Sequence, residues 1–285
     1  MKLTNKHNLP GPIYSKVLSG MRPNPPRYGL TTLLRPAHMV ALEIKHWDEL
    51  EADAMDHVWR LFGSAIHQMI AVDDEKTILR EHLLETIVDG VTVRTAVDRL
   101  WRDGPRNVLT EFKTTSVWSV VFGKPEWEQQ LNLQGAVLMA NGRRADKMEV
   151  VALLRDFSAR DAKYDSQKPQ TPVVRVEVET WAPERADKFL RDRVAAHKSA
   201  RNGSIGECSD EERWAKPDTY AVMKPGRKSA LRVLPSHAEA ATWGNLNALG
   251  QFTIEHRPGE NTRCERYCPV SLFCDQFKQL KQEIT

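Results

Sequence analysis

The spacing of apolar residues separates the middle of the chain into stretches that predict helices and stretches that predict strands. In residues 48–70, 125–142 and 182–200 the apolar positions recur every three or four residues, which is the period of an amphipathic helix. Alternating apolar and polar residues predict two strands within 82–101 and one strand each over 107–116, 147–158 and 172–181.

Turn residues mark where these elements begin and end. Asp89-Gly90 has the composition of a two-residue hairpin turn, so it joins the first two strands. Asp103-Gly104-Pro105 separates the second strand from the third. Pro183 stands where proline is tolerated at the start of a helix, and Asn141-Gly142 is a helix stop.

The order of these elements predicts a mixed α/β fold. Residues 43–200 contain a helix, three strands that look antiparallel, a helix, two strands and a last helix, which suits a central sheet flanked by helices. After residue 200 the pattern weakens into turns, a helix near 236–250 and a cysteine-rich segment. We therefore expect three parts: an N-terminal arm (1–42), an α/β core (43–200) and a C-terminal extension (201–285).

The first 42 residues have an unusual charge pattern. They hold six lysines and arginines, no acidic residue and six of the sixteen prolines of the chain. The stretch "MRPNPPRYG" predicts an extended basic arm suited to lying along phosphates, although a solvated terminus explains the same composition.

Composition excludes few other classes. The 285 residues are enough for one large domain or a domain with an appendage, and the net charge of +3 decides little. No apolar run reaches the roughly 18 residues of a membrane span, and the N-terminus lacks the apolar core of a signal peptide. We therefore expect a cytoplasmic protein without a membrane partner, whose cysteines are not in disulfides.

The strand over 107–116 carries the first candidate chemistry. Glu111 and Lys113 point to the same face of that strand because side chains alternate along it. Asp98, near the end of the preceding strand, can bring a second carboxylate to the same end of the sheet. Two neighbouring carboxylates repel each other unless a divalent cation lies between them, and oxygen ligands suit Mg²⁺ or Mn²⁺. Lys113 would then orient or deprotonate an attacking water, although an ordinary surface ion pair also explains an E-x-K pattern.

Four motifs in this order resemble the RecB-like exonuclease branch of the PD-(D/E)xK nuclease superfamily. "GSAIH" matches its G-x-x-x-H helix and ends at His67, "VDRL" contains Asp98, "EFK" contains Glu111 and Lys113, and "QLNLQ" matches its Q-x-x-x-Y helix at Gln130. Gln134 stands where that branch usually has tyrosine. The resemblance implies a restriction-endonuclease-like sheet and hydrolysis of DNA. It also implies that His67, Asp98 and Glu111 hold Mg²⁺ or Mn²⁺, and that Lys113 and Gln130 join them in catalysis.

A second candidate metal centre lies near the C-terminus. Cys264, Cys268 and Cys274 fall within eleven residues, and Cys208 is the other cysteine of the chain. Such clusters bind zinc or an iron–sulfur centre through thiolates, but this spacing lacks the C-x2-C pairs of many zinc sites. His256 can replace one cysteine in a zinc site, and unligated thiols are a third alternative.

The cysteine segment resembles the C-terminal cluster of AddB-type and CRISPR-associated iron–sulfur nucleases, and "ECSDEERW" resembles phage exonucleases. Those nucleases usually take one cysteine from before the G-x-x-x-H helix, whereas this chain has none before Cys208. The resemblance implies a [4Fe–4S] cluster on the four cysteines. Such a cluster would staple the C-terminal segment in place.

Two further sets of residues are candidates for DNA contact. One is a basic stretch without acidic residues, which contains Lys224, Arg227, Lys228 and Arg232. The other is a set of tryptophans that would stack on unpaired bases unless they belong to the core: Trp118, Trp127, Trp214 and Trp243.

Together these features predict a metal-dependent DNA exonuclease that acts in phage or bacterial recombination or DNA processing. Its partners would be DNA and either a single-strand annealing protein or a helicase. A structure-specific endonuclease, a CRISPR-adaptation nuclease and a non-catalytic DNA-binding module remain alternatives. Cleavage polarity, strand preference and oligomeric state are left open.

Overall fold

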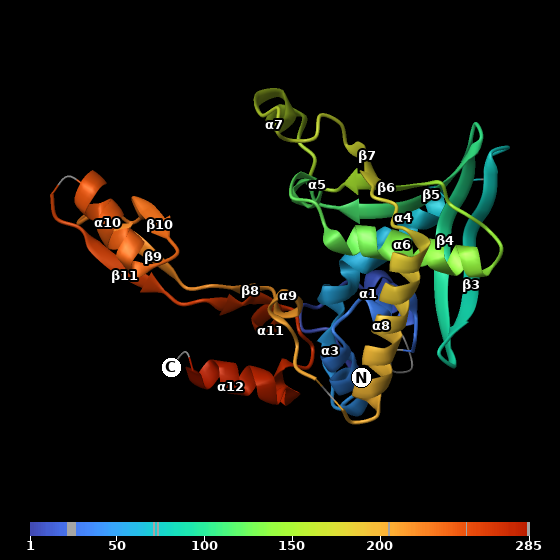
Figure 1. Ribbon diagram of the computed structural model, residues 1–285, viewed down its shortest axis with the longest axis horizontal. Coiled ribbons are helices and arrows are strands. Elements are labelled where there is room, and N and C mark those ends of the chain that lie inside the picture. The colour runs from blue at the N-terminus through green and yellow to red at the C-terminus, as the bar shows by residue number, and fades with distance from the viewer. Residues whose placement is uncertain (22–26, 71, 73, 205, 249, 284–285) are drawn as a thin grey trace. The chain divides into compact units, whose positions relative to one another are not determined.

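The computed structural model describes residues 1–21, 27–70, 72, 74–204, 206–248 and 250–283 (Figure 1). The chain divides into two compact units, residues 1–205 and residues 206–285, which are described separately below. This division lies close to the boundary expected after residue 200.

A mixed five-stranded sheet forms the centre of the first unit. Its strands lie in the order β3-β4-β5-β6-β7, and all neighbours are antiparallel except β5 and β6, which are parallel. The strand bounds are β3 (Thr77–Val88), β4 (Val91–Asp103), β5 (Arg106–Thr115), β6 (Lys147–Leu154) and β7 (Val173–Val178). The five strands expected from the alternating pattern are therefore all present.

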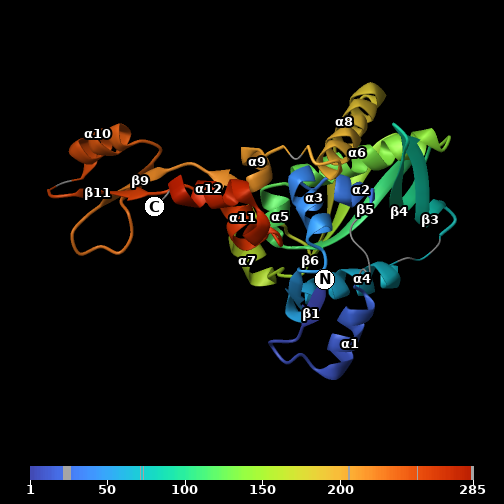
Figure 2. The same cartoon turned by 90° about the horizontal axis from the view of Figure 1, so that it is seen from below.

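Helices cover this sheet and the adjoining N-terminal segment (Figures 1 and 2). Their bounds are α1 (Gly11–Ser19), α2 (Leu30–Leu33), α3 (Ala37–Lys45), α4 (Val58–Ile70), α5 (Val117–Val121), α6 (Pro125–Ala140), α7 (Ala159–Tyr164) and α8 (Pro183–Arg201). Helix α6 contacts every strand of the sheet, and α8 packs against α6 and α3. The first unit is thus a mixed α/β fold with a central sheet flanked by helices.

The predicted turns have the expected backbone. Asp89 and Gly90 have φ angles of 46° and 78°, as a two-residue hairpin turn with two left-handed positions requires. Helix α6 begins at Pro125, and Gly142 follows its end with φ of 71°. Leu131, Leu133 and other apolar residues of α6 are fully buried in the main core of the unit.

The stretch over 48–70 is not one continuous helix. Residues Glu51–Asp53 form strand β2, which pairs in parallel with β1 (Lys2–Thr4), and a 3₁₀ turn, η1 (Ala54–His57), then leads into α4. The helical run starts late because the Asp53 carboxylate accepts the N–H of Met55 in a capping box, which fixes its N-terminus.

The N-terminal arm was expected to be extended, and this expectation is wrong for the described residues. Pro10 and Pro36 are the N-cap residues of α1 and α3, so proline starts helices here instead of keeping the chain extended. Leu30 and Leu33 on α2 are buried in the core of the unit. The proline-rich residues 22–26 lie outside the described residues.

The second unit contains two small sheets and several short helices. Its strands are β8 (Ala215–Lys216), β9 (Thr219–Met223), β10 (Arg232–Leu234), β11 (Thr253–Arg257) and β12 (Glu260–Asn261). Its helical elements are α9 (Asp210–Arg213), α10 (His237–Asn247), α11 (Thr262–Arg266), η2 (Ser271–Phe273) and α12 (Asp275–Glu283). Strand β9 lies between β10 and β11, and β8 pairs with β12. A small core of Val222 and Ala240 with Trp243 and Phe252 joins α10 to the three-stranded sheet.

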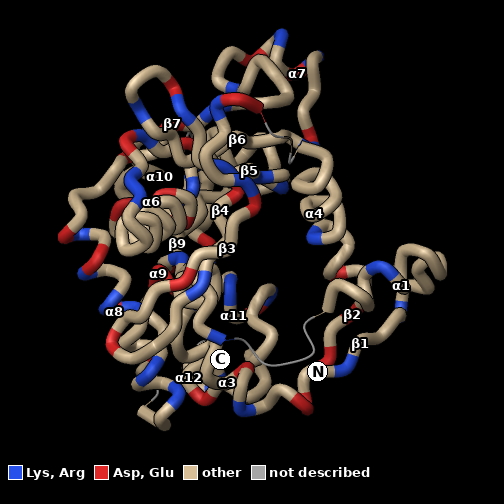
Figure 3. Tube along the Cα trace, turned by 90° about the vertical axis from the view of Figure 1, so that its right-hand side faces the viewer, with Lys and Arg blue, Asp and Glu red and all other residues tan. Residues whose placement is uncertain are grey.

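Charged residues of both signs are interspersed along the chain trace (Figure 3). On α8 this produces two pairs at i, i+4 spacing, Lys188 with Asp192 and Arg191 with Asp187. None of the helices in the described part of the chain combines the length and the apolar composition needed to cross a membrane.

Candidate active site and cysteine cluster

The candidate active site lies where β4 and β5 separate. Their ladder of paired residues ends at Arg99 and Thr110, so Asp98 and Glu111, the next residues on the two strands, are no longer joined by backbone hydrogen bonds. Beyond this point the Asp98 side chain joins the two strands, because its Oδ2 accepts the N–H of Phe112 at 2.8 Å. The end of this ladder therefore brings the two carboxylate residues predicted from sequence to one place.

Glu111, Lys113 and Gln130 form a closed ring of hydrogen bonds. Lys113 Nζ donates to Glu111 Oε1 at 2.6 Å and to Gln130 Oε1 at 3.0 Å, while Gln130 Nε2 donates to Glu111 Oε1 at 2.8 Å. Glu111 and Gln130 are buried, and the Lys113 side chain is 28% exposed. An ammonium has three donors, so Lys113 keeps one N–H for a further partner.

Gln134, four residues after Gln130 on α6, holds the other side of Glu111. Its Nε2 donates to Glu111 Oε2 at 3.0 Å and to the carbonyl of Ala96 on β4 at 3.1 Å. It thereby bridges the two strands where their ladder has ended. The residue that departs from the Q-x-x-x-Y pattern is thus part of the same buried network, as its spacing of one helical turn from Gln130 allows.

His67 approaches Asp98 from α4, and its tautomer follows from its partners. Its Nε2 lies 2.9 Å from the carbonyl oxygen of Phe112, which only accepts, so Nε2 carries the hydrogen. In the neutral imidazole Nδ1 is then a free ligand atom. Nδ1 lies 3.7 Å from Asp98 Oδ2 and 3.5 Å from Glu81 Oε1. Among the residues that the structure describes, His67, Glu81 and Asp98 form the group whose ligand atoms all lie within 4.8 Å of one another.

Glu81 is the functional candidate that the sequence interpretation missed. It lies on β3 between Arg80, which pairs with Arg99, and His82, which pairs with Val97, so it stands opposite Asp98. A hairpin with a two-residue turn at Asp89-Gly90 has only one register, and that register predicts this position. Glu81 also has a left-handed backbone, with φ of 42°, which is unfavourable for a residue with a side chain.

The electrostatics of the site favour bound positive charge. The pKa of Asp98 is raised from 3.8 to about 7. Burial is the main cause and the nearby Glu111 and Glu81 carboxylates act in the same direction, while the Phe112 N–H and His67 lower the pKa. A buried carboxylate group with this arrangement binds a proton or a cation more readily than isolated carboxylates do.

The donor set fits a divalent cation. Glu111 Oε1 already accepts two hydrogen bonds and Oε2 accepts one, so one of its about four lone-pair sites remains, on Oε2. Asp98, Glu81 and the Nδ1 atom of His67 supply the other donors, which are oxygen and nitrogen atoms of the kind that Mg²⁺ and Mn²⁺ accept.

The four cysteines all lie in the second unit, and none forms a disulfide. The pKa of Cys208 is raised to about 12, mainly by burial, then by the charge of Glu212 and by those of Cys264, Cys274 and Cys268. The pKa of Cys264 is also raised, to about 11, mainly by burial and then by the charges of Cys268 and Cys274. The segment around residue 208 and the segment over 264–274 therefore bring their thiols together.

Hydrogen bonds fix this arrangement. The side-chain amide of Gln276 on α12 accepts the N–H of Cys208 at 2.9 Å and donates to its carbonyl oxygen at 2.9 Å. His256 has a different partner, because its Nε2 lies 2.6 Å from Asp218.

The candidate DNA-contact residues differ in their surroundings. Arg227, Lys228 and Arg232 are exposed, and Lys224 is half-buried, along the loop and strand after β9 in the second unit. Trp127 is buried in the main core, and Trp243 is partly buried against the small core. Trp118 and Trp214 are 51% and 40% exposed.

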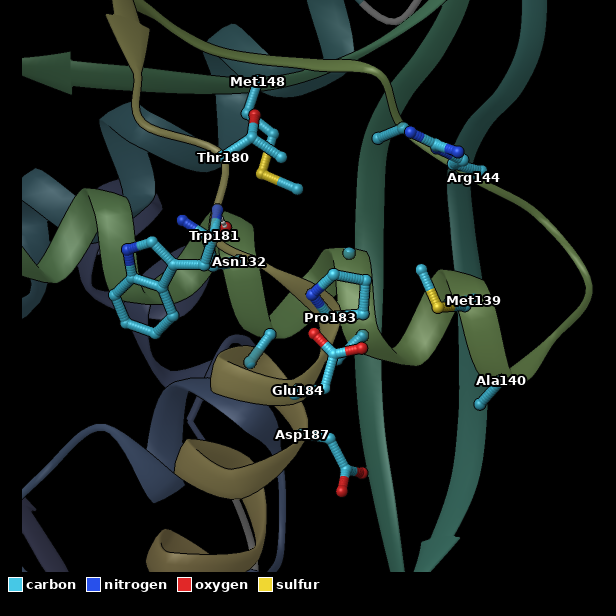
Figure 4. A pocket seen from close by; sticks show the side chains of 14 residues that line it. Asn132, Met139, Ala140, Arg144, Met148, Thr180, Trp181, Pro183, Glu184 and Asp187 are labelled. Atoms are coloured by element: carbon cyan, nitrogen blue, oxygen red, sulfur yellow. Dashed lines mark hydrogen bonds between the residues drawn. The ribbon is translucent and has the colours of Figure 1, made fainter.

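A cavity of about 530 Å³ is lined in part by residues of α6 (Figure 4). Asn132, Met139 and Trp181 contribute to its wall. Asn132 is two residues from both Gln130 and Gln134, about 200° around the helix, so the cavity is separate from the candidate active site.

Comparisons with known proteins leave the family of this chain open. No known family profile matches the sequence, and no curated protein matches it. Among solved structures, a chain titled "Crystal structure of SSO0001" is similar with 17% sequence identity and a TM-score of 0.42, over 64% of this chain and 83% of that chain. A likeness of this size carries no argument about function. The structure shows a mixed α/β protein with a five-stranded central sheet.

Proposed function

We propose that this protein is a divalent-cation-dependent nuclease that hydrolyses phosphodiester bonds at DNA ends, with a restriction-endonuclease-like fold of the PD-(D/E)xK superfamily. The observation that carries the proposal is the hydrogen-bonded ring of Glu111, Lys113 and Gln130 beside the buried ligand atoms of Asp98, His67 and Glu81. A protein that only binds DNA has no need of a lysine held beside a cation-binding carboxylate group.

The residues of the site have distinct roles in this proposal. Asp98, His67, Glu81 and Glu111 would hold Mg²⁺ or Mn²⁺, which polarises the phosphodiester and stabilises the charge that develops during hydrolysis. Lys113, fixed by its two hydrogen bonds, directs its remaining N–H to the attacking water or to the phosphate.

The glutamines position these groups. Gln130 prevents Lys113 from leaving Glu111, and Gln134 prevents Glu111 from turning away from Asp98. The hydrogen bond from His67 Nε2 to Phe112 keeps Nδ1 directed towards the carboxylates.

We further propose a [4Fe–4S] cluster on Cys208, Cys264, Cys268 and Cys274, with zinc as the alternative. The sequence spacing of these cysteines lacks the C-x2-C pairs of many structural zinc sites, whereas four thiolates are the ligands of a [4Fe–4S] cluster.

The wider setting of the reaction is proposed on the same basis. DNA is the substrate, and a single-strand annealing protein or a helicase is the expected partner in recombination or DNA processing. An endonuclease on the same fold is separated from an exonuclease by comparing circular with end-labelled linear DNA.

The test is cleavage of end-labelled DNA in Mg²⁺ and Mn²⁺ by the Glu111→Gln and Lys113→Ala variants. We expect each to lose cleavage by about 100-fold or more, because each removes a group that acts on the developing charge or on its cation, while DNA binding stays within about twofold. The controls are Glu149→Gln, another buried glutamate of this sheet, and Lys147→Ala on β6. Wild-type rates in either site variant would reject this active site. An inactive wild-type protein would favour the DNA-binding module.

A further inference from the structure

Two exposed aromatic rings lie just beyond the strand that carries Glu111 and Lys113. Trp118, on α5, is 51% exposed, and Phe122, the C-cap residue of the same helix, is 78% exposed. Their ring centroids are 5.5 Å apart with an interplanar angle of 14°, so the two rings are stacked nearly parallel. The described surface therefore offers a flat aromatic face to solvent.

Stabilisation of α5 does not account for these rings. Aromatic pairs at i, i+4 spacing do support helices, but by covering each other and the helix surface. Phe122 remains more than three-quarters exposed and so covers little. Leucine or alanine would support so short a helix as well, so the exposed π-faces need another explanation.

The position of α5 is fixed by hydrogen bonds to the active-site strand and its neighbour. The Thr115 hydroxyl at the end of β5 donates to Ser119 Oγ on α5 at 2.8 Å, and the N–H of Val117 donates to Asp156 Oδ1, after β6, at 2.7 Å. Trp118 is five residues after Lys113, so it lies at most roughly 17 Å along the chain from it. A strand of nucleic acid at Lys113 reaches the rings within a few nucleotides.

Positive charge accompanies exposed rings on this side of the site. Lys168 Nζ lies 5.6 Å from the centre of the Trp118 ring and 3.2 Å from Asp161. The Arg155 guanidinium lies 4.7 Å above the ring of Trp59, which is 59% exposed on α4, the helix that carries His67. Among the described residues Arg155 makes no ion pair with a carboxylate, so its charge is available to a phosphate.

We propose that Trp118 and Phe122 form a stacking platform for an unpaired base next to the scissile phosphate, so that the enzyme takes single-stranded DNA or an unpaired end. This inference rests on the proposed nuclease function. Exposed rings beside cations are what binding of single strands requires, since each unpaired base has a π-face for stacking and each nucleotide has a phosphate. In a duplex the faces of the internal bases are covered by their neighbours, so the platform favours unpaired strands.

The test measures DNA binding, in the Glu111→Gln background so that the DNA stays intact in Mg²⁺. Fluorescence anisotropy compares an oligothymidylate of about 20 nucleotides, longer than the roughly 4–16 that one single-strand site covers, with a blunt duplex of the same length. Trp118→Leu and Phe122→Leu keep the apolar bulk and remove the ring. Each should weaken single-strand binding by about 5- to 150-fold, the equivalent of about 1–3 kcal/mol of stacking per base, and change duplex binding less than about twofold.

Two controls separate stacking from loss of structure. Trp118→Tyr and Phe122→Tyr keep an aromatic face and should retain affinity, whereas Ile87→Ala removes an exposed apolar side chain at the far end of β3 and should have no effect. An abasic strand of equal length keeps the phosphates without the bases. The Glu111→Gln protein should bind this abasic strand as weakly as the leucine variants bind oligothymidylate. This comparison tests stacking without any substitution in α5.

The outcomes distinguish failure of the platform from failure of the nuclease proposal. Unchanged single-strand affinity in both leucine variants, equal losses for single strands and duplex, or equal affinity for abasic and normal strands would each overturn the platform, and the rings would then belong to a protein partner. If the Glu111→Gln protein binds neither form of DNA, or still cleaves, the nuclease proposal itself fails.

Discussion

Burial and the neighbouring carboxylates both raise the pKa of Asp98. The pKa in the folded chain is about 7, against an ordinary value of 3.8, so between about pH 4 and pH 7 the folded state holds a proton that the unfolded chain has released. The stability of the metal-free protein should therefore fall as the pH rises through this range. Above it, Asp98 is a charged and destabilising residue until a cation binds.

This residue yields a prediction about metal-free protein. Asp98→Asn keeps an oxygen for the Phe112 N–H and removes the charge, so the melting temperature at pH 8 should rise by more than about 2 °C, the shift that about 1 kcal/mol produces in a domain of this size. At pH 5 the gain should largely disappear, because Asp98 is already protonated there. Thermal unfolding in EDTA measures both values.

Asp156→Asn is the control, since Asp156 also accepts a backbone N–H, from Val117, outside the carboxylate group. A gain at pH 8 that persists unchanged at pH 5 would contradict the pKa assigned to Asp98.

At the scale of elements, β3 is interrupted where it meets the site. Glu81 has a left-handed backbone between two residues that pair normally with β4. This conformation costs roughly 1–2 kcal/mol for a residue with a side chain. Strain of this kind at a candidate ligand is consistent with a role in function.

Two substitutions separate the strain from the charge of Glu81. Glu81→Gln removes the carboxylate alone, while Glu81→Asn also introduces a residue that tolerates the left-handed region. We expect both to weaken Mn²⁺ binding about tenfold or more, and Glu81→Asn to leave the metal-free protein about 0.5–1 kcal/mol more stable than Glu81→Gln does. Calorimetric titration of DNA-free protein with Mn²⁺ and thermal unfolding measure the two effects.

Glu85→Gln, on the same strand and paired with Arg94 at 2.6 Å, is the control. Mn²⁺ affinity equal to wild type in both Glu81 variants would remove Glu81 from the site.

At the scale of the whole molecule, the four cysteines belong to one of the two units. They join the segment at residue 208 to the segment over 264–274 within residues 206–285. The thiols of Cys208 and Cys264 have raised pKa values, and metal binding must displace their protons. The free energy of binding is then part of the folding free energy of this unit.

The corresponding prediction concerns protein purified without oxygen. It should be brown with broad absorbance near about 400 nm, a feature of iron bound by thiolate and sulfide. Cys208→Ser should bleach it and lower the melting temperature of residues 206–285, whereas Ser229→Ala, an exposed change in the same unit, should do neither. Colourless protein that contains one equivalent of zinc would show that the cysteines hold zinc and not an iron–sulfur cluster. Metal-free protein that is as stable as the Cys208→Ser variant would reject both.

Local patterns in the sequence were sufficient for most of the elements. Strand alternation, the Asp89-Gly90 turn and the helix stop at Asn141-Gly142 depend on neighbouring residues, and the structure confirms each of them. The N-terminal segment was misjudged because proline both disfavours helix interiors and begins helices. Which of these applies depends on the burial of Leu30 and Leu33, a property of the fold.

The sequence alone determined which residue types could act together, since the order of His67, Asp98, Glu111, Lys113 and Gln130 was enough to group them. Only the tertiary structure decided how they meet. The end of the β4–β5 ladder, the bridging by Gln134 and the approach of Glu81 depend on contacts between residues far apart in the chain. The same holds for the choice of Trp118 over Trp127 as an exposed ring, because burial is set by packing of whole elements and not by the residues next to each tryptophan.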